Sequence, residues 1–292
     1  MKILGIVGSC RRLGNTEILV KEALMAAQQE GAEVDIVRWT DFNILPCEGD
    51  AICMFMNKDC KHKDGHPFLL NMMYGFDGVV FGAPCYILEV EAVVKQFIDR
   101  LFIMTSRPSE MVGKPAAIIV PYATRGWTSY ALLQPTILLH FLGMDIVDKQ
   151  LIHIQAMSET AGDTLAQEKA RRIGREVAFA VKTGDHSYRG DPGICPVCHE
   201  RNIRIMSDNQ TVECGICAIR GTLSMVDGNI KVDFPPDQYK WHRFARESLY
   251  RHSTYEIKPS KDYFTRKWPE LKEARRKYKE YLDIDRAARE VK

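Results

Sequence analysis

The most constraining feature of the sequence is an alternation of strand-like and helix-like segments over its first 183 residues. Short apolar runs predict five strands, at 3–7, 34–37, 78–82, 116–120 and 146–154. Segments with helical spacing of apolar residues lie at 16–29, 67–74, 91–105, 130–142 and 158–182. Such alternation predicts an α/β fold, a doubly wound parallel sheet with helices on both faces. Five strands favour the order 2-1-3-4-5.

Composition excludes several classes of protein. Of the 292 residues, 46% are hydrophobic and 27% are charged, as in ordinary soluble domains. The net charge of +2 gives no global attraction to nucleic acid or acidic lipid. No apolar run approaches the roughly 20 residues of a membrane helix, and the first residues resemble a strand more than a signal peptide. We therefore expect a cytoplasmic protein with neither membrane nor nucleic acid as a partner.

The loop at residues 8–16 joins the first predicted strand to the first predicted helix. Unpaired N–H groups and the helix dipole favour an anion at such a junction. Ser9, Asn15 and Thr16 add polar donors, and Arg11 adds a positive charge. The loop lacks both the dinucleotide glycine pattern and the Gly-Lys-Ser/Thr of nucleoside triphosphate sites. A polar turn with a good helix cap is the plainer alternative, but the density of donors predicts phosphate binding.

This loop resembles that of the NADPH-dependent FMN reductase family, which has a flavodoxin-like fold. The family pattern Gly-Ser-x-Arg-x-x-Gly-Asn-Thr is matched from Gly8 to Thr16, and a second block follows at 82–86 and 95–100. The resemblance covers roughly residues 1–180. It implies bound FMN, with the Pro-x-Tyr loop lying along the isoalloxazine ring and a third flavin loop at 121–128. The implied cofactor-binding residues are Ser9, Arg11, Gly14, Asn15, Thr16, Pro84, Cys85, Tyr86, Ile87, Tyr122, Thr124 and Gly126.

No catalytic side chain is assigned, because the flavin itself carries the redox chemistry. The sequence accordingly offers no convincing Ser-His-Asp set or pair of carboxylates.

Three further cysteines, Cys47, Cys53 and Cys60, lie in an insertion between the second and third predicted strands. Here the chain resembles the iron–sulfur flavoproteins, whose compact cysteine motif in this insertion holds a [4Fe–4S] cluster. Asp50 stands at the second cysteine position of that motif. The resemblance implies a cluster with three thiolates, and four is the usual ligation. A loop with remnant cysteines and a regulatory thiol pair are the alternatives.

Cys195, Cys198, Cys214 and Cys217 form a Cys-x2-Cys-x15-Cys-x2-Cys pattern, which is a strong signal for a tetrahedral metal site. Zinc is the first expectation for such a ribbon and iron the second. We expect it to act as a staple or an interface element. The predicted domains are a flavodoxin-like domain at 1–183, including the insertion at 40–66, the metal ribbon at 184–236 and a tail at 237–292.

The tail is rich in aromatic and basic residues and ends in a charged helix predicted at 269–292. A basic aromatic segment can bind nucleic acid. We favour instead an arm that packs on a second subunit, with Trp241, Phe244, Leu249 and Tyr250 as its anchors. Together with the insertion, this arm predicts a homodimer or homotetramer.

The predicted function is an FMN-dependent oxidoreductase. Its donor would be NAD(P)H or a ferredoxin, its acceptor a small molecule or a protein, and a cluster in the insertion would be an intermediary if present. One alternative is an electron-transfer flavoprotein without a small-molecule substrate. A second is a plain NAD(P)H-dependent flavin or quinone reductase without a cluster. A third is a flavin-bearing regulator that contacts nucleic acid.

Overall fold

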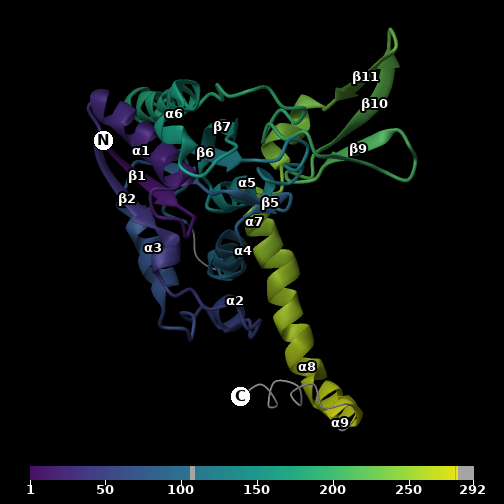
Figure 1. Ribbon diagram of the computed structural model, residues 1–292. Coiled ribbons are helices and arrows are strands. Elements are labelled where there is room, and N and C mark those ends of the chain that lie inside the picture. The colour runs from purple at the N-terminus through teal and green to yellow at the C-terminus, as the bar shows by residue number, and fades with distance from the viewer. Residues whose placement is uncertain (106–108, 280, 282–292) are drawn as a thin grey trace. The chain divides into compact units, whose positions relative to one another are not determined.

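The computed structural model describes residues 1–105, 109–279 and 281 (Figure 1). Its main feature is a five-stranded parallel sheet in the order β2-β1-β3-β6-β7, which confirms the predicted order. The strands are β1 (Lys2–Val7), β2 (Glu33–Arg38), β3 (Gly78–Gly82), β6 (Pro115–Tyr122) and β7 (Asp145–His153). Their carboxyl ends meet at one edge of the sheet, where ligands of open α/β sheets bind.

Helices cover both faces of this sheet, as the alternation in the sequence predicts (Figure 1). On one face lie α1 (Asn15–Gln29) and α6 (Thr164–Thr183), and on the other α3 (Gly65–Tyr74), α4 (Ala92–Asp99) and α5 (Leu133–Phe141). Alternate strand residues enter the two cores: Leu4 and Ile6 face α3–α5, whereas Ile3 and Val7 face α1 and α6. A Cβ on Gly174 would lie 1.8 Å from the Ala23 carbonyl oxygen, so glycine permits the close contact of α6 with α1.

The helices predicted at 158–182 and 91–105 differ most from prediction. α6 begins at Thr164 and not at Ser158, because Asp163 caps it by accepting hydrogen bonds from the N–H groups of Leu165 and Ala166. The preceding residues form a 3-10 turn at Glu159–Ala161. The helix expected over 91–105 is divided into α4 and a 3-10 turn at Leu101–Thr105.

The segments between these elements carry short structures. A 3-10 turn (Trp39–Asp41) follows β2, and α2 (Ile52–Met56) lies in the insertion. β4 (Cys85–Tyr86) and β5 (Glu89–Val90) form a small hairpin.

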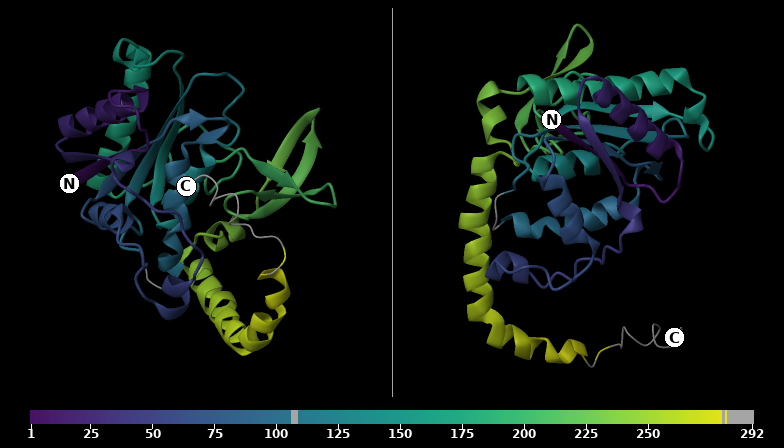
Figure 2. Two further views of the ribbon diagram at one scale, coloured as in Figure 1. Left: turned by 60° about the horizontal axis from the view of Figure 1, so that its bottom comes forward. Right: turned by 90° about the vertical axis from the view of Figure 1, so that its left-hand side faces the viewer.

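The four-cysteine region forms a separate antiparallel sheet in the order β11-β10-β9-β8. Its strands are β8 (Ile203–Ile205), β9 (Thr211–Cys214), β10 (Arg220–Val226) and β11 (Asn229–Asp233). The β10–β11 hairpin extends outward in all views (Figures 1 and 2). This ribbon belongs to the same compact unit as the parallel sheet, which comprises residues 1–249.

Residues 250–292 make up a second compact unit. α7 (Arg246–Arg251) leads into a π-helical turn (His252–Ile257), α8 (Lys258–Ala274) and α9 (Arg276–Lys279). The prediction that Pro269 begins a helix is wrong, since Pro269 lies inside α8 and another proline occupies its first turn. The remainder of that predicted helix, at 280 and 282–292, lies outside the described residues. None of the described helices is long and apolar enough to cross a membrane.

Candidate active site and metal centre

A groove of about 110 Å³ opens at the carboxyl edge of the parallel sheet. All but three of the residues predicted to bind the cofactor line it: Ser9, Arg11, Gly14, Asn15, Thr16, Pro84, Cys85, Tyr86 and Tyr122. Pockets that enclose a whole ligand usually hold about 300–1,000 Å³. The groove is therefore smaller than a pocket that encloses a whole ligand.

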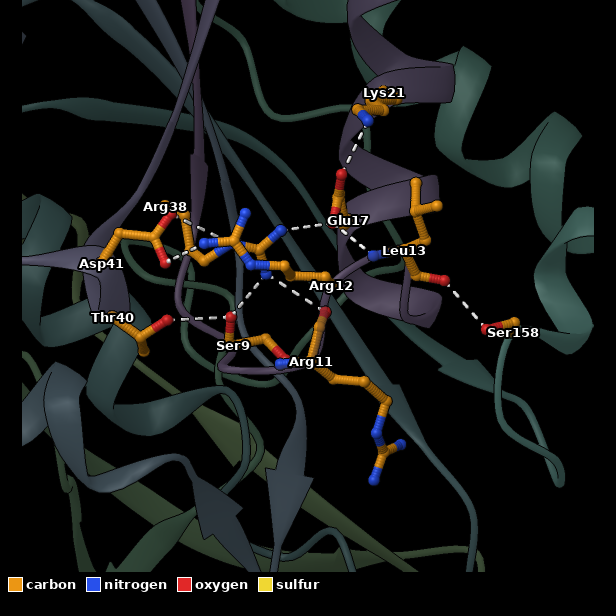
Figure 3. A network of polar contacts seen from close by, with 10 residues as sticks. All are labelled: Ser9, Arg11, Arg12, Leu13, Glu17, Lys21, Arg38, Thr40, Asp41 and Ser158. Atoms are coloured by element: carbon orange, nitrogen blue, oxygen red, sulfur yellow. Dashed lines mark hydrogen bonds and ion pairs between the residues drawn. The ribbon is translucent and has the colours of Figure 1, made fainter.

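The loop after β1 supplies the polar end of this groove. The Arg11 guanidinium has no hydrogen-bond or ion-pair partner among the described residues, and it extends away from the surrounding polar network (Figure 3). Arg12, by contrast, pairs with Asp41 at 3.4 Å and does not line the groove. The first N–H groups of α1, at Asn15 and Thr16, have no partner within the helix. An unpaired cation beside unpaired N–H donors is the set that a phosphate monoester requires.

The Asn15 side chain also makes contacts within the protein. Its Nδ2 donates to the Ala156 carbonyl oxygen at 2.8 Å, and its Oδ1 accepts from the N–H and hydroxyl of Thr160. One of its two side-chain N–H donors is thus bonded within the protein, and these contacts tie the segment after β7 to the loop at residues 8–16. Ser158 adds a second tie, because its Oγ donates to the Leu13 carbonyl oxygen at 2.9 Å.

The flat side of the groove is formed by the residues around the β4–β5 hairpin. Ile87 and Leu88, at its turn, have φ values of 48° and 74°, which are unusual for residues other than glycine. The Tyr130 N–H holds this turn by donating to the Leu88 carbonyl oxygen at 3.0 Å. Burial is the main cause that raises the pKa of Tyr86, so its hydroxyl keeps its proton at neutral pH.

Three predicted residues, Ile87, Thr124 and Gly126, do not line the groove. Ile87 lies at the exposed tip of the hairpin, where its side chain is 83% exposed. Sequence reasoning missed the opposite wall, formed by residues 154–157. The sequence could have indicated this wall, because residues 154–157 directly follow the last strand and the carboxyl ends of parallel strands lie at one edge of the sheet.

The four ribbon cysteines come together in one buried group that could hold a metal ion. All four are buried, and their sulfur atoms all lie within 4.8 Å of one another. Tetrahedral metal–thiolate bonds of 2.3 Å place sulfurs roughly 3.8 Å apart. Two matching turns present them: His199 and Ala218 have positive φ values, and their N–H groups donate to Cys195 and Cys214 carbonyls at 3.0 Å.

Hydrogen bonding among the four cysteines shifts their pKa values in opposite directions. The Cys217 N–H donates to Cys214 Sγ at 3.4 Å. Hydrogen bonds from the other cysteines, Cys195 first, hold the pKa of Cys214 far below its usual range despite burial. The hydrogen bonds with Cys195 are also the first cause that raises the pKa of Cys198 and of Cys217.

Comparison with known proteins identifies the family. A model of the NADPH-dependent FMN reductase family matches residues 1–157, which contain the phosphate loop and the β4–β5 hairpin. The chain belongs to this family. It is therefore an FMN-dependent oxidoreductase, as the resemblance of its phosphate loop predicts.

Several relatives extend this result. An iron-sulfur flavoprotein of Methanocaldococcus jannaschii is 30% identical over 195 residues, which are 62% of this chain and 98% of that protein. A flavone synthase of Aspergillus candidus is 25% identical over 289 residues, covering 86% of this chain and 87% of that protein. The solved structure of a flavone reductase has a TM-score of 0.80 at 22% identity, with 97% of this chain and 99% of that chain covered. This member of the FMN reductase family thus shares its fold with the flavone reductase over nearly the whole length of the chain.

In this member of the FMN reductase family, the ribbon is anchored to the flavodoxin-like sheet. Lys149, on the edge strand β7, donates to Glu200 Oε1 at 2.6 Å and to the Cys198 carbonyl oxygen at 2.8 Å. The Tyr188 ring stacks on His199 with 3.7 Å between centroids. The core around the cysteines also includes partly buried side chains of α5, which explains why ribbon and sheet form one unit.

The expectation that Phe244 anchors the tail on a second subunit is wrong. It is 8% exposed and packs in the ribbon core with the four cysteines, so it is not an anchor for another subunit. The neighbouring Arg243 N–H donates to the Cys217 carbonyl oxygen at 2.8 Å. Trp241 and Tyr250, in contrast, are 51% and 66% exposed.

The middle cysteines line a second cavity of about 800 Å³, which shares no residue with the groove at the sheet edge. Cys47, Cys53, Cys60 and Asp50 all face it. Burial, followed by the charges of Cys60 and Cys47, raises the pKa of Cys53, so the three thiols influence one another. Their sulfurs do not gather as the ribbon sulfurs do: among described residues, the one set of three or more potential ligands within 4.8 Å is the ribbon.

Proposed function

We propose that this FMN-dependent oxidoreductase takes two electrons from NAD(P)H and passes them to a planar aromatic small molecule. The observation that carries this proposal is the groove at the sheet edge. It combines the unpaired Arg11 and buried Ser9 at one end with an open surface bearing Tyr86 and Tyr122 at the other. Such an arrangement suits a cofactor fixed by its phosphate and exposed at its ring.

The residues of the chain have limited chemical roles in this proposal. Arg11, Ser9 and the first N–H groups of α1 would hold the phosphate, while Pro84, Cys85 and Tyr86 would border the ring. FMN, when bound, supplies hydride transfer, so no acid–base triad is required of the protein. The protonated Tyr86 hydroxyl is suited to donate a hydrogen bond to an acceptor oxygen.

The class of acceptor is inferred from the full-length relatives. A flavone synthase and a flavone reductase match 86% and 97% of the chain, whereas the iron-sulfur flavoprotein matches 62%. Exposed apolar side chains at or beside the groove, Tyr86, Ile87, Trp127 and Met157, offer a surface for a flat aromatic ring. Anaerobic turnover with flavone, a quinone and free FMN as separate acceptors would rank these classes. No turnover of any of these three acceptors would refute the aromatic acceptor.

The double substitution Arg11→Ala and Thr16→Ala is expected to weaken FMN binding by at least about tenfold, since it removes a charge-assisted contact and a hydroxyl. Fluorescence titration of the apoprotein with FMN measures this loss. Arg12→Ala is the matched control, because Arg12 is 79% exposed, pairs with Asp41 and lies outside the groove. Equal FMN affinity in the parent and the double variant would show that the phosphate lies elsewhere.

We propose zinc as the metal of the ribbon. A closed, buried set of four thiolates suits a structural zinc ion, although the same geometry accepts iron. Metal analysis of the purified protein distinguishes the two, because one equivalent of iron in place of zinc would overturn this assignment.

We also propose that Cys47, Cys53 and Cys60 hold an iron–sulfur cluster, with Asp50 at the fourth position. Support comes from their common cavity and from the iron-sulfur flavoprotein relative. When bound, such a cluster exchanges single electrons with a carrier of the ferredoxin type. A carboxylate is a harder ligand than thiolate, so the cluster should be labile in oxygen.

Anaerobically reconstituted protein is therefore expected to contain acid-labile sulfide, and Cys53→Ala is expected to abolish it. Cys10→Ala is the control, since Cys10 is exposed and lies outside this cavity. If the parent protein contains no sulfide after reconstitution, the segment is a structural loop and the enzyme works without a cluster.

The exposed aromatic residues of the C-terminal unit support a homo-oligomer. Its described residues include Tyr255, Tyr263, Phe264 and Tyr278, each at least 45% exposed. We propose that this unit packs on another copy of the chain in a dimer or tetramer. Truncation after Leu249 keeps Phe244 and the ribbon core and is expected to lower the oligomeric state measured by sedimentation. A full-length chain that is monomeric at micromolar concentration would contradict this.

A further inference from the structure

A buried ion pair lies directly behind the phosphate loop. Glu17, on α1, and Arg38, at the end of β2, have side chains that are 9% and 11% exposed. Arg38 Nη2 donates to Glu17 Oε2, and Lys21 Nζ donates to Glu17 Oε1 at 2.6 Å. Neither Glu17 nor Arg38 lines the groove, so neither would touch a ligand there.

Arg38 acts on the loop through two carbonyl groups. Its Nη1 donates to the carbonyl oxygen of Ser9 at 2.9 Å and of Arg11 at 3.1 Å, and Thr40 Oγ1 donates to the former at 3.0 Å (Figure 3). The C=O and N–H of one trans peptide point in opposite directions. The N–H groups of Cys10 and Arg12 therefore point away from Arg38, and neither has a hydrogen-bond partner among the described residues.

Glu17 fixes a third point of the loop. Its Oε2 accepts from the Leu13 N–H at 2.6 Å, and Leu13 has a φ of 50°, in the left-handed region. A residue other than glycine keeps this conformation only where its surroundings impose it. The ion pair thus holds peptide groups along the loop from Ser9 to Leu13 (Figure 3).

We propose that Glu17 and Arg38 are positioning residues that hold this loop in the shape in which Ser9 and Arg11 face the phosphate of FMN. The inference rests on the proposed FMN site and extends it, because it assigns phosphate recognition to a pair that does not touch the ligand. It predicts selectivity: the pair should matter for FMN and hardly at all for riboflavin, which has the same ring and no phosphate.

Arg38→Met is expected to weaken FMN binding about ten- to hundredfold and riboflavin binding by no more than about threefold. The substitution releases the Arg11 carbonyl and leaves Thr40 as the one side-chain donor to the Ser9 carbonyl. It also leaves the Glu17 carboxylate behind the loop with Lys21 as its one charged partner among the described residues. Glu17→Gln still accepts the Leu13 N–H and should cause a smaller loss of the same kind. If Arg38→Met does not fold, Arg38→Lys and Glu17→Gln provide the comparison of the two flavins.

Arg175→Met is the control, because it removes a positive charge on α6 whose partner, Glu168, lies outside the loop and the groove, and it should bind both flavins like the parent. Equal losses for FMN and riboflavin in the Arg38 variant would overturn the inference, since they indicate general damage. FMN affinity equal to that of the control would also overturn it. If the parent binds neither flavin, the proposed function fails and the inference with it.

Discussion

The Cys214→Ala variant is expected to lose its metal and the folded state of the ribbon. Structural zinc in small cysteine sites contributes about 10–16 kcal/mol to folding. A ribbon of short strands cannot lose that much folding free energy and stay folded. Cys214 is fully buried among the other three thiols, so no side chain outside the set can replace it. Metal analysis should find the metal absent, and limited proteolysis should cut between residues 195 and 235.

The flavin should remain bound in that variant, because the groove is lined by residues of the parallel-sheet region alone. The absorbance of bound FMN measures this directly. Cys10→Ser serves as the control and should keep one equivalent of metal, since Cys10 is exposed and outside the ribbon. A Cys214 variant that keeps both its metal and its resistance to protease would contradict the assignment.

The Lys149→Met variant is expected to lose about 3–5 kcal/mol of unfolding free energy, because it leaves the charge of Glu200 buried and unpaired. The side chains of this pair are 2% and 5% exposed, and their hydrogen bond joins β7 to the ribbon. Adding Glu200→Gln removes the unpaired buried charge, so the double variant should recover part of the lost unfolding free energy. Urea unfolding followed by circular dichroism measures both values.

An exposed pair provides the comparison. Lys231 and Asp233 lie 3.0 Å apart with side chains 57% and 55% exposed, so Lys231→Met should change stability by less than about 1 kcal/mol. If Lys149→Met is as mild as Lys231→Met, the buried pair does not hold the ribbon to the sheet.

Much of the fold follows from patterns with a simple physical cause. Strand residues such as Leu4 and Ile6 are buried on one face while Ile3 and Val7 are buried on the other, which produces the continuous apolar runs read in the sequence. The phosphate loop is likewise local in sequence, so its donors are visible without a structure. The ribbon is predictable because its cysteine spacing alone specifies a tetrahedral site.

The remaining features depend on contacts between distant residues. Asn15 is an anchor for Ala156 and Thr160, and nothing in its local sequence indicates a partner more than 140 residues away. Phe244 lies in a tail of surface-like composition, yet it completes the ribbon core. The pairing of Glu17 with Arg38 has the same origin, since β2 reaches the loop only after the sheet forms.

The Pro269 error has a local explanation. Proline is favoured in the first turn of a helix, which suggested a helix starting there. α8 instead begins at Lys258, with Pro259 in its first turn and Pro269 inside it. Because either proline could mark the first turn of a helix, the sequence alone leaves the start of α8 ambiguous.

Anaerobic reduction of the purified protein tests the central account most directly. The protein should carry about one equivalent of FMN per chain, identified after release, and stoichiometric NADPH or NADH should bleach the absorbance of the bound flavin. Reoxidation by an aromatic acceptor should then restore the absorbance. A protein that binds no FMN after incubation with excess cofactor, or whose bound FMN neither nucleotide reduces, would contradict an NAD(P)H-driven FMN enzyme.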